Sequence, residues 1–253
     1  MVVPFLWMLS TGLKSDIQAY VFPPELIPDP VVWQNVATVW TSLPFGRFML
    51  NSGVVAIAVT AGQLLFSSMA AFAFARLRFP FRGQIFLAYL GTMMLPYHVV
   101  LIPIFILVRT LGWIDTYQGL IVPHLFSAYA TFLLRQFFIT IPMELEEAAR
   151  VDGASHFRIY WQIMLPVSKP ALATLGVFVF MFSWNDFLWP LIVINTLELK
   201  TLPIGLSYFL TQYTVYWNLL MVGTSLAILP VLLVFFFTQR YFVQGITLTG
   251  IKA

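Results

Sequence analysis

Cysteine is absent from the 253 residues of the sequence, and charged residues are scarce. Without cysteine the chain forms no disulfide bond and no thiolate metal site, although this absence does not fix its compartment. Charged residues make up 9% of the chain, against about 25% in soluble domains. A net charge of +3 gives no basic surface of the kind that binds nucleic acid. Because 60% of the residues are hydrophobic, the composition predicts a protein that crosses the lipid bilayer several times.

Sequence motifs for ATP binding, metal binding and catalysis are also missing. The chain has no G-x-x-x-x-G-K-[ST] stretch, so it does not bind ATP by that device. His98, His124 and His156 are scattered without metal-ligand spacing, and for the first two packing is favoured over a role in a transport path. No Ser–His–Asp arrangement or carboxylate pair is evident. We therefore expect no catalytic residue, no metal site and no cofactor in this chain.

Long apolar runs are the main feature that is present. Residues 1–13 are apolar but too short to cross a bilayer alone, and they lack the basic start of a signal peptide. We expect them to be the second half of a truncated first span, followed by an outer proline-rich segment up to residue 48. Five further segments have the roughly 20 residues that a complete span needs. They are about 49–75, 84–110, 118–140, 170–194 and 218–240.

The predicted fold class is therefore all-α, a polytopic transmembrane helical bundle of five complete spans plus a truncated first span. Residues 1–48 and the transmembrane core 49–253 are its two parts. Pro96 and Pro103 are expected to kink the segment 84–110, because proline interrupts helical hydrogen bonding.

Lysine and arginine are unevenly divided between the loops. Loops 76–83, 141–169 and 241–253 hold seven of them, and the loops on the opposite side hold three. The seven are Arg76, Arg78, Arg82, Arg150, Arg158, Lys169 and Lys252, and the three are Lys14, Arg47 and Lys200. Cytoplasmic loops are enriched in these residues. We therefore expect a multi-pass protein of the cytoplasmic membrane, with residues 141–169 and the C-terminus in the cytoplasm.

The opposite loops would then face outward. Residues 10–48 are proline-rich, so they do not form one continuous helix. Residues 195–217 are amphipathic and aromatic. Such a segment suits either the headgroup level of the membrane or a contact with a partner, and both interpretations stay open.

Residues 141–169 contain the charged stretch EEAARVDGASHFRIYWQIMLP. Pro142 suits the first turn of a helix, and the acids that follow complement its positive end. Gly153 can end this helix in a left-handed conformation, and Ser155 can cap a second helix over 156–165, which stops near Pro166. The pattern predicts a helix, a sharp corner and another helix.

Ala148 and Ala149 leave one side of the first helix nearly bare, which permits close approach by another body. Flanking charges would fix the register of such a contact more than they would strengthen it. We favour a projection that fits a cleft in a cytoplasmic partner over an amphipathic hairpin that lies on the membrane.

The same stretch resembles the EAA loop of ATP-binding-cassette importer permeases. Glu147-Ala148-Ala149 is followed by three residues, Gly153, nine residues and Ile163-Met164-Leu165-Pro166, which matches every fixed position of that loop. The resemblance implies a coupling helix that docks on an ATP-hydrolysing subunit, and we call residues 141–169 the coupling loop. The residues expected to couple are Glu146, Glu147, Ala148, Ala149, Arg150, Asp152 and Gly153.

Three further stretches resemble the carbohydrate branch of that family, specifically its maltose-type second permease subunit. They are RFMLNS (47–52), SWNDFLWPL (183–191) and QRYFVQGITLTGIKA (239–253). The resemblance implies a MetI-like permease core that pairs with a homologous second permease subunit. It also implies two ATP-binding subunits, which hold ATP and Mg, and an extracytoplasmic sugar-binding protein.

Asp186 is the acid that falls within a predicted span, where a carboxylate costs at least ~2.5 kcal/mol at mid-bilayer. With Trp184, Asn185 and Asn51 it suits a path for a polyol, because sugars are bound by such polar groups and by aromatic rings. A structural hydrogen-bond network is the equal alternative. Gln63, with other polar groups, lies in the same span as Asn51.

The expected function is thus import of a sugar or related polyol by alternating access, driven by partner ATPases. The alternative is a secondary transporter coupled to an ion gradient, although no inverted repeat is apparent. An intramembrane enzyme is the weaker third interpretation.

Overall fold

The computed structural model describes residues 2–211 and 213–249, with the backbone alone for 240–249. This part of the chain is almost entirely helical and contains one isolated bridge, between Leu210 and Val215, but no strand. The predicted all-α class is confirmed. The helices are α1 (Val3–Gly12), α2 (Gln34–Ser42), α3 (Phe45–Arg76), α4 (Arg82–Gly91), α5 (Tyr97–Thr110), α6 (Tyr117–Ile121), α7 (Ala128–Thr140), α8 (Glu144–Val151), α9 (His156–Ile159), α10 (Leu165–Val167), α11 (Lys169–Trp184), α12 (Leu188–Val193), α13 (Leu202–Ser207) and α14 (Trp217–Thr249).

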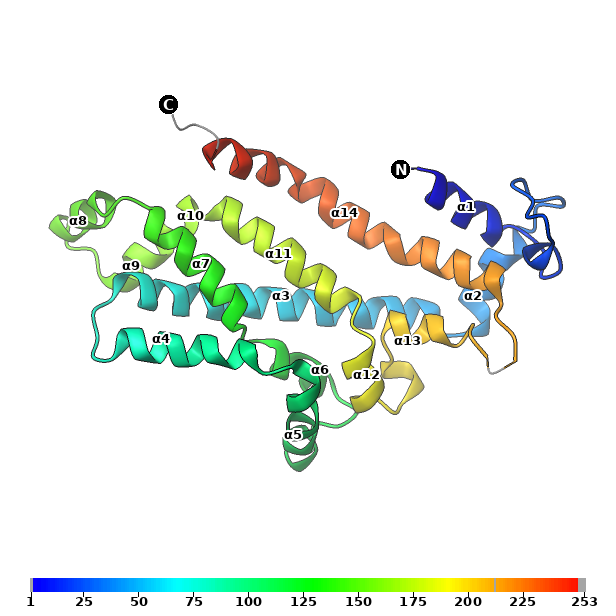
Figure 1. Ribbon diagram of the computed structural model, residues 1–253, viewed down its shortest axis with the longest axis horizontal. Coiled ribbons are helices and arrows are strands. Elements are labelled where there is room, and N and C mark those ends of the chain that lie inside the picture. Colours follow the sequence, from blue (N-terminus) through cyan, green and yellow to red (C-terminus); the bar gives the residue numbers. More distant parts are fainter. Residues whose placement is uncertain (1, 212, 250–253) are drawn as a thin grey trace.

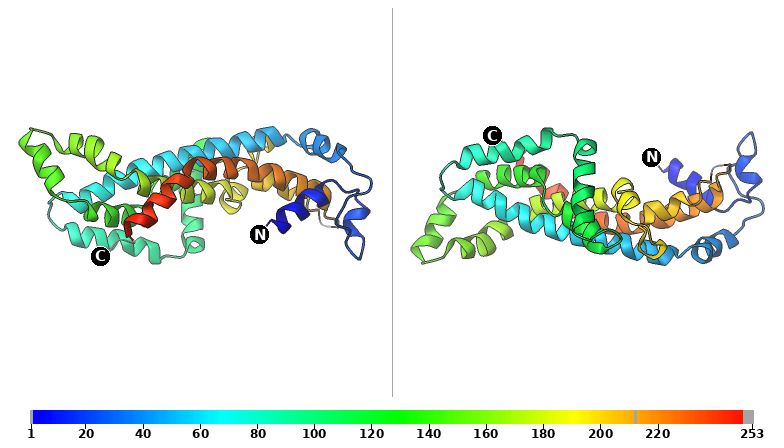
Figure 2. Two further views of the ribbon diagram at one scale, coloured as in Figure 1. Left: turned by 90° about the horizontal axis from the view of Figure 1, so that it is seen from above. Right: turned by 90° about the horizontal axis from the view of Figure 1, so that it is seen from below.

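The molecule is elongated, and α3 and α14 run along its length (Figure 1). Helices α7 and α11 pack against α3, while α1, α2 and α11 pack against α14. The corner formed by α8 and α9 lies at one end of the molecule, and α1 and α2 lie toward the other (Figure 2). The coupling loop is therefore separated from α1, α2 and the segment between them by most of the length of α3.

Two helices are long and apolar enough to cross a membrane unbroken, Phe45–Arg76 and Trp217–Gln239. Two bent helix pairs raise this number to four within the described residues, if each pair is one span. The predicted segment 118–140 is divided into α6, a short 3-10 turn and α7. The count of five complete spans and the boundary at residue 48 stay predictions.

Pro96 explains the sharper of the two bends. Arg82–Met94 and Tyr97–Thr110 meet at 100°, and α5 projects sideways from the bundle (Figure 1). A residue before proline avoids the helical conformation, and Leu95 is extended here (ψ 119°). The predicted kink at Pro96 is confirmed, whereas α5 continues through Pro103.

Buried side chains form two clusters that share α3. One contains Val55, Phe72, Phe138 and Met164, and the other contains Phe48 with side chains of α2, α11, α13 and α14. Large apolar side chains also cover the outside, as on a protein surrounded by lipid or by further subunits. Helix α3 therefore contacts both the region of the coupling loop and the opposite end, where α2 and α13 lie.

Candidate functional site

The coupling loop folds into the predicted helix, corner and second helix. Gly153 has φ +76° and ends α8, because its amide donates to the carbonyl of Arg150 (3.0 Å). The next amide, of Ala154, donates to the carbonyl of Ala149 (2.9 Å). This pair of bonds is a Schellman motif, for which a left-handed residue is required. Ser155 then caps α9 by accepting from the amide of Arg158 (3.3 Å).

The second helix is longer and less regular than predicted. It starts as α9, continues as a π-helix over Tyr160–Met164 and ends as α10 at Val167. The helix ends at Val167, one residue after Pro166, in agreement with the predicted stop near that proline. The helix then bends by 77° into α11.

Most of the residues expected to couple lie on the outside of α8. Glu147, Ala148, Arg150, Asp152 and Gly153 are exposed, and Ala149 is partly buried. Ala149, Asp152, Ala154, Arg158, Gln162 and Ile163 line a polar groove of about 210 Å³ beside the corner. This face combines small side chains with charges of both signs, as a docking surface requires.

Glu146 is the exception, because its side chain is 1% exposed and faces the bundle. The residue was expected to contact a partner along with its neighbours, and the structure places it away from that surface. Its Oε1 lies 2.7 Å from Nε of Arg76 at the end of α3. Its Oε2 is 4.0 Å from the guanidinium of Arg150, one turn later in the same helix. Sequence spacing did not reveal Arg76 as a partner, because that residue lies in a distant helix.

The residues expected along a substrate path are not brought together. Trp184 is buried, and its indole donates to the carbonyl of Ala227 (3.2 Å). Asn185 bonds back to its own helix at the carbonyl of Met181 (2.7 Å). Asn51 is fully buried, and all three of its hydrogen bonds go to protein groups. For Trp184 and Asn51 the structural alternative fits the geometry better.

Asp186 does face a cavity, but a small one. Its carboxylate accepts from the amide of Trp189 (3.3 Å). It lines, with Gln63, His124 and other side chains, a space of about 10 Å³. That is room for one water molecule and not for a sugar.

A larger cavity of about 220 Å³ adjoins this space and shares Gln63, His124 and Trp189 with it. Tyr97 and Ser127 add hydroxyl groups to its lining. The sequence shows Gln63 and His124 as separate polar residues, but no sequence pattern joins them into one cluster. His124, for which packing was favoured, does pack edge-on against Trp189, at 5.8 Å between ring centres.

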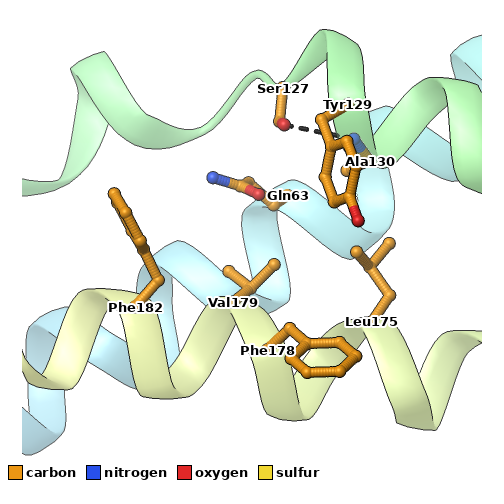
Figure 3. Close-up of a pocket in the computed structure, with 8 residues that line it drawn as sticks. All are labelled: Gln63, Ser127, Tyr129, Ala130, Leu175, Phe178, Val179 and Phe182. Atoms are coloured by element: carbon orange, nitrogen blue, oxygen red, sulfur yellow. Dashed lines mark hydrogen bonds between the residues drawn. The ribbon is translucent and has the colours of Figure 1, made fainter. Parts of the chain in front are cut away.

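Gln63 also borders a third cavity, of about 260 Å³, between α3, α7 and α11 (Figure 3). Its amide extends from α3 toward the gap between the other two helices (Figure 3). Apolar side chains of α11 form one wall, including Phe178, Val179 and Phe182. Gln63 thus links the cavities in the middle of the bundle, and its amide donates to the carbonyl of His124 (2.7 Å).

Comparison with known proteins gives a consistent result. Residues 63–248 match the family described as binding-protein-dependent transport system inner membrane component. The sn-glycerol-3-phosphate transport system permease protein UgpE of Escherichia coli (strain K12) is 40% identical over 250 residues, which cover 95% of this chain and 89% of the relative. The protein of the same name from Yersinia pestis is 39% identical over 240 residues, covering 92% and 85%.

Solved structures show the same fold. A chain of a bacterial ATP-binding-cassette transporter involved in the import of the acidic polysaccharide alginate superposes with a TM-score of 0.85 at 24% identity, covering 95% of this chain and 90% of that one. A second structure, of a bacterial alginate transporter in complex with an alginate-bound periplasmic protein, gives a TM-score of 0.67 at 15% identity. The chain therefore belongs to the binding-protein-dependent transport system inner membrane components, and it is a permease subunit of an ATP-binding-cassette importer.

Proposed function

We propose that this permease imports a small polyol phosphate or a related sugar, together with a homologous second permease subunit. Two ATP-binding subunits on the cytoplasmic side would hold ATP and Mg²⁺, and an external binding protein would deliver the substrate. Support for the substrate class comes from the glycerol phosphate permeases, which match this chain along nearly its whole length. The alginate transporters support the fold alone, because their sequences are only 24% and 15% identical to this chain.

The coupling role of α8 is carried by one observation. At the end of an otherwise apolar molecule, a short helix exposes Glu147, Ala148, Arg150 and Asp152 beside a polar groove. A bare, charged helix surface that is fixed by a Schellman corner is a rigid projection. We propose that it docks on one ATP-binding subunit in the cytoplasm. The expected cytoplasmic C-terminus includes residues 250–253, which lie outside the described part of the chain.

The substrate path through the membrane would include the cavity lined by Gln63, Tyr97 and His124, and we assign this part of the path to this subunit. Hydroxyl, amide and imidazole groups bind the hydroxyl groups of a polyol. Asp186 stands beside them, and its carboxylate would repel a phosphate, so the hydroxyl-bearing end of the substrate is expected here. Alternating access would connect this cavity to either side of the membrane in turn.

Reconstitution of the purified complex in liposomes tests the proposal. We expect uptake of glycerol phosphate that requires two components. ATP must be present on the side of the membrane where the ATP-binding subunits lie, and the substrate-loaded binding protein must be present on the opposite side. Glu147→Lys reverses a charge on the docking surface, and Gly153→Pro removes the amide that ends α8. Both variants should insert in the membrane but lose either the ATP-binding subunit or ATP-driven uptake.

Two results would contradict this function. Uptake driven by an ion gradient without ATP would favour a secondary transporter. Normal ATP-driven uptake by both variants would remove the coupling role of α8. A screen of sugars and polyol phosphates against the external binding protein identifies the substrate, because discrimination can reside in that partner.

A further inference from the structure

We infer that α3 carries the movement of α8 to the segment 198–202, which is bound at the other end of α3. We also infer that Arg76 and Glu146 are positioning residues for transport. This inference rests on the proposed docking of α8 to an ATP-binding subunit. Helix α8 is covalently continuous with α7 and, through α9, with α11. The buried polar contacts of the coupling loop, one from Glu146 in α8 and one from Tyr160 after α9, are however made with α3, which is distant in sequence.

The first contact joins α3 to the beginning of α8. Arg76 pairs with Glu146 at 2.7 Å, and the side chains are 8% and 1% exposed. The same guanidinium donates from Nη2 to the carbonyls of Phe138 (2.6 Å) and Ile141, at the end of α7. The planar fork of arginine makes such multiple contacts possible, which lysine does not reproduce. One side chain of α3 therefore holds both the end of α7 and the start of α8.

The second contact joins α3 to the other side of the corner. The hydroxyls of Ser68 and Tyr160 lie 2.8 Å apart, and both side chains are buried. The Phe72 ring packs against Tyr160 with ring centres 5.5 Å apart. Because α3 holds the chain before and after the corner, a push on the corner has to displace α3 or break a buried contact.

The outer end of α3 is fixed to the segment 198–202 in a similar way. The Asn51 amide donates to the carbonyls of Glu198 (2.8 Å) and Lys200 (2.9 Å). The hydroxyl of Ser52 accepts from the amide of Leu202 (2.8 Å). Between Asn51 and Arg76 the helix is continuous, and this stretch spans about 38 Å at 1.5 Å per residue. A displacement at the corner therefore reaches the outer loop through one rigid element.

A first experiment measures ATP hydrolysis by the reconstituted complex with and without the substrate-loaded binding protein. Glu146→Gln keeps the shape of the side chain but removes its charge. We expect the stimulation by the binding protein to fall about tenfold, while basal hydrolysis stays within about twofold of the wild type. Arg76→Lys should give an intermediate value, because lysine can pair with Glu146 without also holding both carbonyls. The matched control is Arg78→Ala, an exposed arginine two residues away.

If the binding protein stimulated ATP hydrolysis by Glu146→Gln as strongly as hydrolysis by the control Arg78→Ala, the inference would be overturned. A wild-type complex without any stimulation would instead contradict the proposed function, so the two failures are distinguishable. A merely structural role would lower basal and stimulated hydrolysis together, and that outcome also counts against a positioning role.

A second experiment does not depend on those variants assembling. The absence of cysteine allows spin labels to be placed at single pairs of introduced cysteines. Met69→Cys, an exposed position of α3, with His156→Cys reports on α3 and the corner, and His156→Cys with Leu233→Cys reports on the corner and α14. On nucleotide binding we expect the first distance to stay constant and the second to change. A change in the first distance, or no change in either, would overturn the inference.

Discussion

Asp115 is a single side chain that joins the loop between α5 and α6 to the segment after α12. It follows α5 with a left-handed backbone (φ 60°), and its Oδ1 accepts from the amides of Asn195 (3.0 Å) and Thr196 (2.9 Å). The Thr196 hydroxyl donates to Oδ2. Hydrogen bonds from the Thr196 hydroxyl, and then from its amide, lower the pKa of Asp115 below its ordinary value. The charged carboxylate is thus the form that holds the loops together.

The pH dependence of this contact follows from the sign of the shift. Because the pKa of Asp115 is lower in the folded state, the stabilisation is fully present above the ordinary value of about 3.9 and is lost as the pH falls through the folded value. Amide hydrogen exchange of residues 194–197, corrected for the intrinsic rate, should show full protection at pH 5 that begins to fall below pH ~4 and decreases further as the pH is lowered.

Asp115→Asn is the control for this prediction, because it removes the charge at every pH. The variant should lack the pH-dependent step and be less protected at neutral pH. If the wild type and Asp115→Asn gave the same exchange profile between pH 3 and 7, the contact would not hold the loops.

At the scale of elements, α13 packs against α3 at a point where only a glycine fits. A Cβ atom on Gly205 would lie 2.2 Å from a ring carbon of Phe48, and that ring is fully buried. This close approach brings α13 and the preceding segment 198–202 against the outer end of α3. It therefore supports the hydrogen bonds made there by Asn51 and Ser52.

Gly205→Ala should therefore destabilise the protein by roughly 1–3 kcal/mol, because overpacking forces ring or backbone shifts. Thermal unfolding of the solubilised protein measures this as a lower midpoint. Phe48→Leu in the same background should recover part of the loss, since the two sites are in contact.

Gly53→Ala is the comparison variant, because Gly53 lies in α3 with no side chain or backbone of another element within 4 Å of the added Cβ. We expect it to be neutral or slightly stabilising, since alanine favours a helix over glycine. Equal midpoints for Gly205→Ala and Gly53→Ala would show that the contact with Phe48 relaxes without cost.

At the scale of the whole molecule, the coupling loop and the loop between α13 and α14 lie at opposite ends (Figure 1). The excess of lysine and arginine predicts that the first end is cytoplasmic. The absence of cysteine makes this orientation directly testable, because any labelling comes from an introduced residue. Phe157 and Tyr213 are suitable positions, with exposed fractions of 67% and 90%.

We expect a membrane-impermeant thiol reagent to label Tyr213→Cys in intact spheroplasts. Phe157→Cys should be labelled only after the membrane is opened. The cysteine-free wild type is the control for background. Labelling of Phe157→Cys in intact spheroplasts would reverse the orientation and remove the proposed docking of α8 in the cytoplasm.

The sequence alone determined the features that depend on local chemistry. Composition excluded a soluble domain, and the EAA spacing indicated the family, because these residues are read in order along the chain. Gly153 and Ser155 predicted the corner, since a left-handed residue and a cap act within a few residues of themselves. Pro96 predicted the break before α5 for the same reason.

Tertiary structure decided which polar groups are free and which are already bonded. Glu146 and Glu147 are adjacent acids, yet one pairs with Arg76 inside the bundle and the other faces outward. Asn51 has the type of side chain that binds sugars, but its amide group donates to backbone carbonyls about 150 positions later in the chain. No local pattern contains such partners, because they meet only when distant helices pack, and burial then fixes each polar group to the partner that satisfies it.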